Sequence, residues 1–339
     1  MIRVGVNGYG VIGRRVAYAI SKQNDMELVG IAKPDPDYKA KLAIKRGFDI
    51  YASCDADRVA SFDSKGVKIR GMLSDLIEKV DIMVDCTPEG VGAKNQKIYD
   101  KAGIKAIWQG GEEHSISNFS FNAYVNYSSA INAKYSRIVS CNTTGLIRTL
   151  NALNNAFGVK SVNAFLVRRA ADPVEIKKGP INAIEIEKDM PSHHGDDVKT
   201  VLSNMDIHTV AAKASTTLMH LHDINVELKK NITKDEVIDT FRKYRRIMLV
   251  SAEDGITSTA HVMDIARELG RGHGDMYEIA VWKEMFVNDR RLQYFQAIHQ
   301  ESDVVPENID AIRAMCNIET DAEKSINKTD ISLGIGVSL

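Results

Sequence analysis

The start of the chain limits its fold more than any other stretch. Residues 2–7 form an apolar run of strand type, residues 8–13 have the sequence GYGVIG, and residues 14–22 have a helical pattern. A strand, a GxGxxG turn and a helix in that order are typical of the first unit of a parallel sheet that binds a dinucleotide. The start of the chain therefore predicts an α/β fold.

Each glycine of this turn has its own physical task. Gly8 allows the tight turn, Gly10 lets a pyrophosphate approach the backbone, and Gly13 lets the helix pack against the strand. The amides of Val11 and Ile12 would face the phosphates at the start of the helix. The alternative is a glycine-rich turn in an α/β domain that binds no nucleotide.

The residues after the second expected strand, residues 27–32, bear on which dinucleotide is used. An acidic residue there would accept hydrogen bonds from the ribose hydroxyls and repel a 2′-phosphate, but this chain has Lys33. A lysine can neutralise a 2′-phosphate, so we predict that NADP is used well. Asp35 and Asp37 lie close by and keep NAD open as a cofactor. The alternative for Lys33 is a solvated loop lysine.

Strand-like and helical runs alternate as far as residue 139. This rhythm predicts a doubly wound parallel sheet of the Rossmann type. Residues 85–90, DCTPEG, form a turn on the edge where such sheets bind nucleotides. Gly110 and Gly111 follow another strand and would let the backbone approach the nicotinamide half of a cofactor. We therefore predict a dinucleotide-binding domain over residues 1–139.

A candidate nucleophile stands where a strand gives way to a helix. Cys141 lies in the sequence SCNTTG at residues 140–145, between the apolar run 137–139 and a helical stretch. Amide groups and the positive end of the helix dipole at such a junction favour a thiolate and hold a developing oxyanion. Asn142, Thr143 and Thr144 add capping and anion-binding donors. The alternative is a small buried cysteine beside a helix cap.

The character of the chain changes after this helix. Five longer runs of strand type, at residues 160–169, 181–187, 207–214, 218–228 and 245–250, predict a mixed or antiparallel sheet. We therefore predict a second, α+β catalytic domain over residues 140–303. Helical residues 304–339 are expected to pack back on the first domain.

The composition of the chain limits the kinds of partner that it is expected to bind. The 339 residues include 44 basic and 45 acidic side chains, so nothing global points to nucleic acid or an anionic membrane. The four cysteines lie far apart and make neither a zinc ribbon nor a disulfide framework. No run of membrane-spanning length and no leader pattern is seen, so we expect a cytoplasmic protein that binds small molecules or copies of itself.

Two clusters of histidines are further candidates. His193 and His194 precede Gly195 at an expected helix start, which suits a substrate phosphate. A metal site there is not expected, because no third ligand has clear spacing. His220 and His222 share one face of an expected strand, and either could be the base that works with Cys141; we favour His220. A packed polar pair is the alternative.

Taken together, the motifs resemble one family along essentially the whole chain. They are VNGYGVIGRR at 6–15, DCTPEG at 85–90, QGGE at 109–112, SCNTTG at 140–145, KKGPINA at 177–183, PSHHG at 191–195, SAEDG at 251–255 and HQESD at 299–303. They are similar to the archaeal type of phosphorylating glyceraldehyde-3-phosphate dehydrogenase. The cysteine motif departs from the SCTTN of the bacterial and eukaryotic enzymes, whose histidine also lies closer to the cysteine in sequence.

The resemblance implies a homotetramer that oxidises D-glyceraldehyde 3-phosphate with phosphate, reversibly, using NADP or NAD. It implies Cys141 as nucleophile, and His220 as the base that takes the hydroxyl proton of a hemithioacetal before a thioester forms. It also implies substrate and cofactor contacts. The implied substrate residues are Ser140, Asn142, His194 and Gly195, and the implied cofactor residues are Val11, Ile12, Gly110 or Gly111, Arg169 and Gln300. Two phosphate seats are needed. The sequence does not show which candidate belongs to which site. The candidates are Thr143, Thr144, Arg168, His193 and His194.

Two other functions remain open from the sequence. A related thioester-forming dehydrogenase, for instance one that acts on aspartate semialdehyde, would share the nucleotide fold and the cysteine. A nucleotide-sensing protein without catalysis would keep the fold and have an unreactive Cys141.

Overall fold

The computed structural model describes residues 1–175 and 177–337, and the chain divides into two compact units. The first unit holds Met1–Val139 and Val305–Leu333, and the second holds Ser140–Val304 and residues 334–337. Among the described residues, no helix combines the length and the apolar character needed to cross a bilayer.

The first unit is built on a seven-stranded sheet whose strand pairs are all parallel, in the order β3-β2-β1-β4-β5-β7-β6. The order reverses between β1 and β4, the point at which sheets of this type bind dinucleotides. The strands are β1 (Ile2–Asn7), β2 (Met26–Lys33), β3 (Ile50–Ala52), β4 (Ile82–Asp85), β5 (Lys105–Trp108), β6 (Ser120–Phe121) and β7 (Tyr135–Ile138). All of β4 and most of β1 is buried, which explains their nearly continuous apolar runs.

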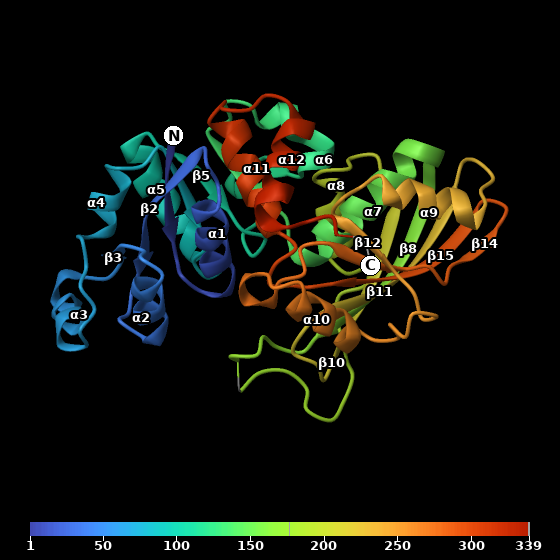
Figure 1. Cartoon of the computed structure of the whole chain (residues 1–339), viewed down its shortest axis with the longest axis horizontal. Helices are drawn as coiled ribbons and strands as arrows, with labels where there is room; N and C mark the ends of the chain where they lie inside the picture. Colours follow the sequence, from blue (N-terminus) through green and yellow to red (C-terminus); the bar gives the residue numbers. More distant parts are fainter. Residues whose placement is uncertain (176, 338–339) are drawn as a thin grey trace. The chain divides into compact units, whose positions relative to one another are not determined.

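Helices connect the strands of this sheet (Figure 1). They are α1 (Val11–Ser21), α2 (Tyr38–Lys45), α3 (Ala60–Ser64), α4 (Leu73–Ile77), α5 (Val91–Ala102) and α6 (Ala123–Asn126), with 3₁₀ turns η1 (Ala56–Arg58), η2 (His114–Ile116) and η3 (Tyr127–Ala130). The unit is completed by α11 (Val305–Met315) and α12 (Ala322–Leu333), of which α11 packs against α1, α12 and α6. The buried Arg313 of α11 holds Asp25 and Gln23, at 2.8 and 2.6 Å.

The end of the chain differs from the expected boundaries. Helices α11 and α12 belong to the first unit, whereas residues 334–337 belong to the second. The reason is a set of hydrogen bonds: Arg271 donates to the carbonyl of Gly334 at 2.6 Å, and the amide of Gly336 donates to Glu278 at 2.9 Å.

The second unit contains an eight-stranded mixed sheet in the order β12-β13-β15-β11-β8-β10-β9, with β14 paired to β15. Strand β8 pairs parallel with β10 and antiparallel with β11. The strands are β8 (Val159–Arg169), β9 (Glu185–Ile186), β10 (Ile207–Ala214), β11 (His220–Leu228), β12 (Ile247–Val250), β13 (Ile279–Trp282), β14 (Phe286–Asn288) and β15 (Arg291–Ile298). The predicted fold class, a Rossmann sheet plus an α+β domain with a mixed sheet, is confirmed.

The helices of this unit are α7 (Cys141–Phe157), α8 (His194–Lys199), α9 (Lys234–Arg242) and α10 (Thr259–Glu268), with the 3₁₀ turn η4 (Gly272–Gly274). Helix α7 contacts β8, β11 and β15 (Figure 1). All twelve residues from Asn142 to Leu153 are buried, so α7 is the core of the unit. It ends where Gly158 takes a φ of 71°.

One expected strand is almost absent. Of residues 181–187, only Glu185–Ile186 pair with the sheet as β9. Ile181 and Ile184 are 91% and 74% exposed, so the alternation of this stretch does not correspond to a buried face. Alternation indicates a strand only where one set of side chains packs.

Candidate active site

Cys141 is the first residue of α7. The hydroxyl of Ser140 caps the helix by accepting from the amide of Thr143, at 3.4 Å. The hydroxyl of Thr143 donates to Asp197 of α8 at 2.6 Å, and both Thr143 and Thr144 are fully buried. These threonines, expected as phosphate ligands, therefore have side chains engaged or enclosed in the core.

The sulfur of Cys141 lies 3.4 Å from Nε2 of His220, the first residue of β11. The amide of Arg169, at the end of β8, donates to Nδ1 of the same ring at 3.0 Å. Because Nδ1 accepts the hydrogen bond from the Arg169 amide, the single proton of the neutral ring lies on Nε2. His220 is thus oriented to donate a hydrogen bond to the sulfur, which differs from the proton-accepting role expected from the resemblance.

Burial dominates the ionisation of this pair. It raises the pKa of the Cys141 thiol to about 12; Asp303 raises it further, whereas Arg169, Arg168 and the amide of Asn142 lower it. Burial also holds the pKa of His220 well below its ordinary value, with His222 and the two arginines acting in the same direction. Burial of the sulfur thus opposes the thiolate that the helix N-terminus is expected to favour.

A directed chain of hydrogen bonds runs behind Cys141. Thr149 donates to Gln296 at 2.8 Å, Gln296 to His222 at 3.2 Å, and His222 to the side-chain oxygen of Asn142 at 3.0 Å. The amide nitrogen of Asn142 then donates to Nε2 of His194 at 3.3 Å. Each imidazole has one donor and one acceptor partner, so both rings fit this chain in their neutral forms.

His194 and Gly195 are engaged at the far end of this chain. Nδ1 of His194 lies 3.2 Å from the hydroxyl of Ser192, and the amide of Gly195 donates to the hydroxyl of Thr209 at 3.0 Å. Burial lowers the pKa of His194 to about 2. The ring is therefore neutral and internally bonded, so as the structure stands it offers no cation to the sugar phosphate assigned to it by resemblance.

Arg168 and His193, the other candidate phosphate ligands, lie beside these groups. Arg168 forms an ion pair with Glu187, and its Nε has no hydrogen-bond partner among the described residues. The exposed His193 stacks on His194 with ring centres 4.0 Å apart. Ligand atoms of Glu187, His193 and His194 lie within 4.8 Å of one another. Because Glu187 already neutralises Arg168 and both His194 nitrogens are bonded, we assign no metal to them.

Gln300 and Arg169, expected to contact the cofactor, are tied to the residues around His220. Gln300 accepts from the amide of Met219 at 2.8 Å, and the guanidinium of Arg169 pairs with Asp172 at 3.0 Å.

The turn in the first unit fits a dinucleotide. A Cβ on Gly13 would lie 1.9 Å from the carbonyl oxygen of Gly8, and Gly8 has a φ of 94°, so both positions require glycine. A Cβ on Gly10 would meet no atom within 4 Å. Helix α1 begins at Val11 with no side-chain cap, which leaves the first-turn amides for phosphate oxygens. Open space above Gly10 is what a pyrophosphate needs.

The other expected cofactor residues lie at strand ends of the same sheet. Lys33 ends β2, is buried, and pairs with Asp37 at 3.2 Å. Asp37 also caps α2 through the amide of Ala40. Gly110 and Gly111 follow β5, and the nearest atom to a Cβ on Gly111 is 3.8 Å away, so a ligand has access to this backbone.

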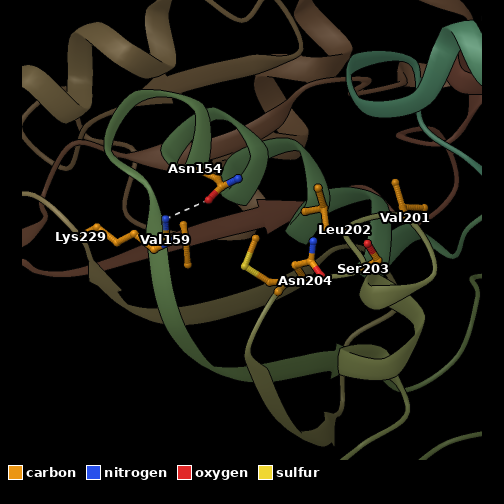
Figure 2. Close-up of a pocket in the computed structure, with 8 residues that line it drawn as sticks. Asn154, Val159, Val201, Leu202, Ser203, Asn204 and Lys229 are labelled. Carbon is orange, nitrogen blue, oxygen red and sulfur yellow. Dashed lines mark hydrogen bonds between the residues drawn. The ribbon is translucent and has the colours of Figure 1, made fainter.

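A separate pocket of about 330 Å³ lies in the second unit (Figure 2). It is lined by Asn154, Val159, residues 201–205 and Lys229. Lys229 is the one titratable group among these lining residues, and none of the predicted site residues takes part, so we assign the pocket no catalytic role.

Two family models match the chain. Residues 140–285 match "Glyceraldehyde 3-phosphate dehydrogenase, C-terminal domain", and residues 2–110 match "Dihydrodipicolinate reductase, N-terminus". The first match covers the thiol–imidazole pair, and the second covers the glycine turn.

Relatives along the full length decide the family. A glyceraldehyde-3-phosphate dehydrogenase of Methanothermus fervidus is 50% identical over 99% of both chains. Those of Thermoplasma volcanium and Pyrococcus abyssi are 53% identical, over 99% and 98% of this chain and 98% and 99% of their own. The chain belongs to the glyceraldehyde-3-phosphate dehydrogenase family. It is thus an oxidoreductase with a nicotinamide dinucleotide cofactor, and the resemblance to the archaeal type is confirmed.

Sequence reasoning missed several polar residues of this dehydrogenase. Asp85, at the end of β4, accepts from Tyr99, Asn95 and the amide of Thr87, at 2.6, 2.8 and 3.0 Å. The pattern that could have revealed it is an acidic residue closing an apolar strand. Gln296 had no such pattern, because it occupies an ordinary inward position of β15.

Proposed function

We propose that this chain catalyses the reversible phosphorylating oxidation of D-glyceraldehyde 3-phosphate to 1,3-bisphosphoglycerate through a thioester on Cys141. The observation that carries the proposal is the 3.4 Å contact between Cys141 and His220 at the N-terminus of a buried helix. A cysteine paired with an imidazole at a helix start suits acyl transfer to and from sulfur.

In this proposal Cys141 acts as a thiolate that adds to the aldehyde carbon and forms the C–S bond. The proton on Nε2 of His220 then stabilises the resulting alkoxide by hydrogen bonding. The nicotinamide dinucleotide supplies the hydride acceptor when bound. Since hydride leaves the alkoxide carbon directly and a thioester remains, no hydroxyl proton has to pass to His220.

Phosphate oxygen next attacks the thioester carbon. The C–S bond breaks, the acyl phosphate leaves, and Cys141 returns as a thiolate that again faces Nε2 of His220. Before the first attack the Cys141 thiol releases its proton to solvent, a loss that Arg168 and Arg169 favour and that burial and Asp303 oppose. One aldehyde, one hydrogen phosphate and one oxidised cofactor then give one acyl phosphate, one reduced cofactor and one proton.

For the anions, we propose Arg168 and His193 as ligands. The free Nε of Arg168 and the exposed ring of His193 support this assignment over Thr143, Thr144 and His194, whose polar groups are engaged or enclosed. Arg168 would exchange part of its ion pair with Glu187 for a phosphate oxygen.

For the cofactor, we propose use of both NADP and NAD. Lys33 at the end of β2 supports NADP, because its ammonium group can meet a 2′-phosphate. Its pairing with Asp37 supports retained use of NAD, since in the absence of a 2′-phosphate the lysine already has a counter-ion.

We also propose a cytoplasmic homotetramer. Three phenylalanines on strands β8, β14 and β15, namely Phe165, Phe286 and Phe295, are 41%, 58% and 46% exposed, which supports contact between copies through this sheet. All four cysteines are free thiols, which suits a reducing compartment.

The experiment is cofactor reduction with glyceraldehyde 3-phosphate, with and without inorganic phosphate, before and after treatment with iodoacetate. Phosphate-dependent activity that alkylation and Cys141→Ser both abolish, with cofactor binding kept, is the expected result. Activity without phosphate would indicate hydrolysis of the thioester instead. Activity only with aspartate semialdehyde, or an unreactive Cys141 without activity, would favour the alternative dehydrogenase or the sensor.

A further inference from the structure

Gln300 is the centre of a small network next to His220. Its side-chain oxygen accepts from the amide of Met219 at 2.8 Å. Its side-chain nitrogen donates to the carbonyl of Thr217 at 3.1 Å and lies 3.4 Å from the carboxylate of Asp172. Gln300 is buried, and every one of these contacts is with the turn before β11 or with its neighbour Asp172.

This turn has an unusual backbone. Met219 has a φ of 67°, the left-handed region that side chains other than glycine seldom adopt. A conformation of this kind persists only when its surroundings hold it. Gln300 supplies that support, because it accepts from the amide of Met219 and donates to the carbonyl of Thr217. Since His220 follows directly, the position of its ring depends on the same turn.

The other side of the ring is fixed by the end of β8. The amide of Arg169 donates to Nδ1 of His220, while the guanidinium of Arg169 pairs with Asp172 at 3.0 Å. Asp172 in turn contacts Gln300. The contacts thus form a closed circuit from Gln300 through Asp172 and Arg169 to His220, and back through Met219.

We propose that Gln300 is a positioning residue for the thiol–imidazole pair: through Met219 and Asp172 it holds His220 with its Nε2–H directed at the sulfur of Cys141. This role is separate from the cofactor contact that the family resemblance assigns to Gln300. It rests on the proposed function, in which Cys141 and His220 perform the reaction.

The titratable groups around His220 fit a ring that donates a hydrogen bond. Arg168 and Arg169 of β8, His222 of β11 and His194 of α8 all disfavour a second proton on it. A neutral ring that donates a hydrogen bond from its single N–H to the sulfur stabilises a thiolate at Cys141, because a hydrogen bond to the charged form favours that form. Loss of the correct ring position should therefore make the thiol harder to ionise.

The test uses the free enzyme and Gln300→Met, which keeps the side-chain volume and removes both polar atoms. The readout is the rate of alkylation by iodoacetamide as a function of pH, without cofactor or substrate. We expect the profile to move up by about one pH unit, and kcat to fall about tenfold with little change in the KM for glyceraldehyde 3-phosphate.

An unchanged alkylation profile with only weaker cofactor binding would overturn the proposal in favour of a cofactor contact. A second measurement covers a variant that does not fold: ¹⁵N spectra of histidine in the unmodified enzyme should show His220 protonated at Nε2. Protonation at Nδ1 would also overturn it. Neither readout needs the proposed substrate, so an enzyme inactive on glyceraldehyde 3-phosphate with the expected profile would refute the proposed function alone.

Discussion

At the scale of single residues, Lys33 is the residue that we propose to distinguish NADP from NAD. Its ammonium group lies 3.2 Å from Asp37 in the buried end of β2. A 2′-phosphate would therefore compete with a carboxylate that is already present, and the strength of that competition sets the preference between NADP and NAD.

Substitutions of Lys33 and of its partner Asp37 should change the KM for NADP in opposite directions. Lys33→Asp should raise the KM for NADP by roughly tenfold and leave that for NAD nearly unchanged, because only NADP carries the added phosphate. Asp37→Asn keeps the oxygen that caps α2 and removes the charge, so it should lower the KM for NADP. Steady-state kinetics with both cofactors measure this. NADP kinetics unaffected by Lys33→Asp would mean that another group recognises the 2′-phosphate.

Among the elements, the glycine turn that opens α1 separates two kinds of requirement. Gly13 is needed by the fold, because its Cβ would overlap the carbonyl oxygen of Gly8. The fold does not need Gly10, because its Cβ would stand in open space, and we propose that the ligand needs it. The sequence motif predicts both kinds of glycine, and the structure gives the Cβ contacts that distinguish them.

The matched pair Gly10→Ala and Gly13→Ala tests this distinction. Gly13→Ala should lower the free energy of unfolding by about 1–3 kcal/mol, since the backbone has to move to admit the methyl group. Gly10→Ala should leave stability unchanged and weaken cofactor binding by about tenfold. Denaturant unfolding and cofactor titration measure the two effects. Equal loss of stability in both variants would contradict the assignment.

The histidine chain that links α7 to β11 and α8 makes stability depend on pH. Burial lowers the pKa of His194 to about 2 and that of His222 to about 3. An unfolded histidine titrates near pH 6.5, so below that pH the unfolded chain binds protons that the folded chain does not. The free energy of unfolding should therefore fall by roughly 1.4 kcal/mol per pH unit for each buried histidine as the pH drops toward the folded values.

Denaturant unfolding at a series of pH values measures the slope. His222→Gln removes one of these groups and should reduce the slope below pH 6.5 by about one histidine's share. His208→Gln is the control, because the His208 side chain is 70% exposed. The same slope in all three proteins would show that the histidine chain is not the source.

These elements also show what a sequence can predict. The glycine turn, Cys141 and His220 follow from local order and strand periodicity, and the structure places Cys141 and His220 3.4 Å apart. The donor orientation of His220 comes instead from the amide of Arg169, a residue distant in sequence. The engagement of His194 likewise depends on Asn142, 52 positions away, so neither could be predicted from a local pattern.

For the whole molecule, the chain passes between its two units three times, near residues 139, 304 and 333. The first passage places Cys141 at the start of the second unit, immediately after a strand of the first. The second passage follows Gln300, so the residue that we propose to position His220 lies five residues before the chain returns to the first unit at Val305. The proposed catalytic pair and the glycine turn thus belong to different units.

The last prediction concerns assembly. Phe165 and Phe295 flank Asp223 in one row across β8, β11 and β15, on the face opposite the buried row of Leu166, His222 and Gln296. Exposed phenylalanines of this kind would be covered in a homotetramer, so Phe295→Asp should place charges against one another at the contact and dissociate the particle. Sedimentation velocity should show smaller species, with the thermal unfolding of the chain little changed.

Ile331→Asp is the control for this substitution. Ile331 is 71% exposed on α12 and lies outside the sheet, so the same change of charge there should leave the particle intact. If Phe295→Asp sediments like the unmodified protein, the sheet face is not the contact. If the unmodified protein is itself a monomer, the proposed homotetramer is refuted. Cys141 and His220 lie within one chain and would keep their proposed roles.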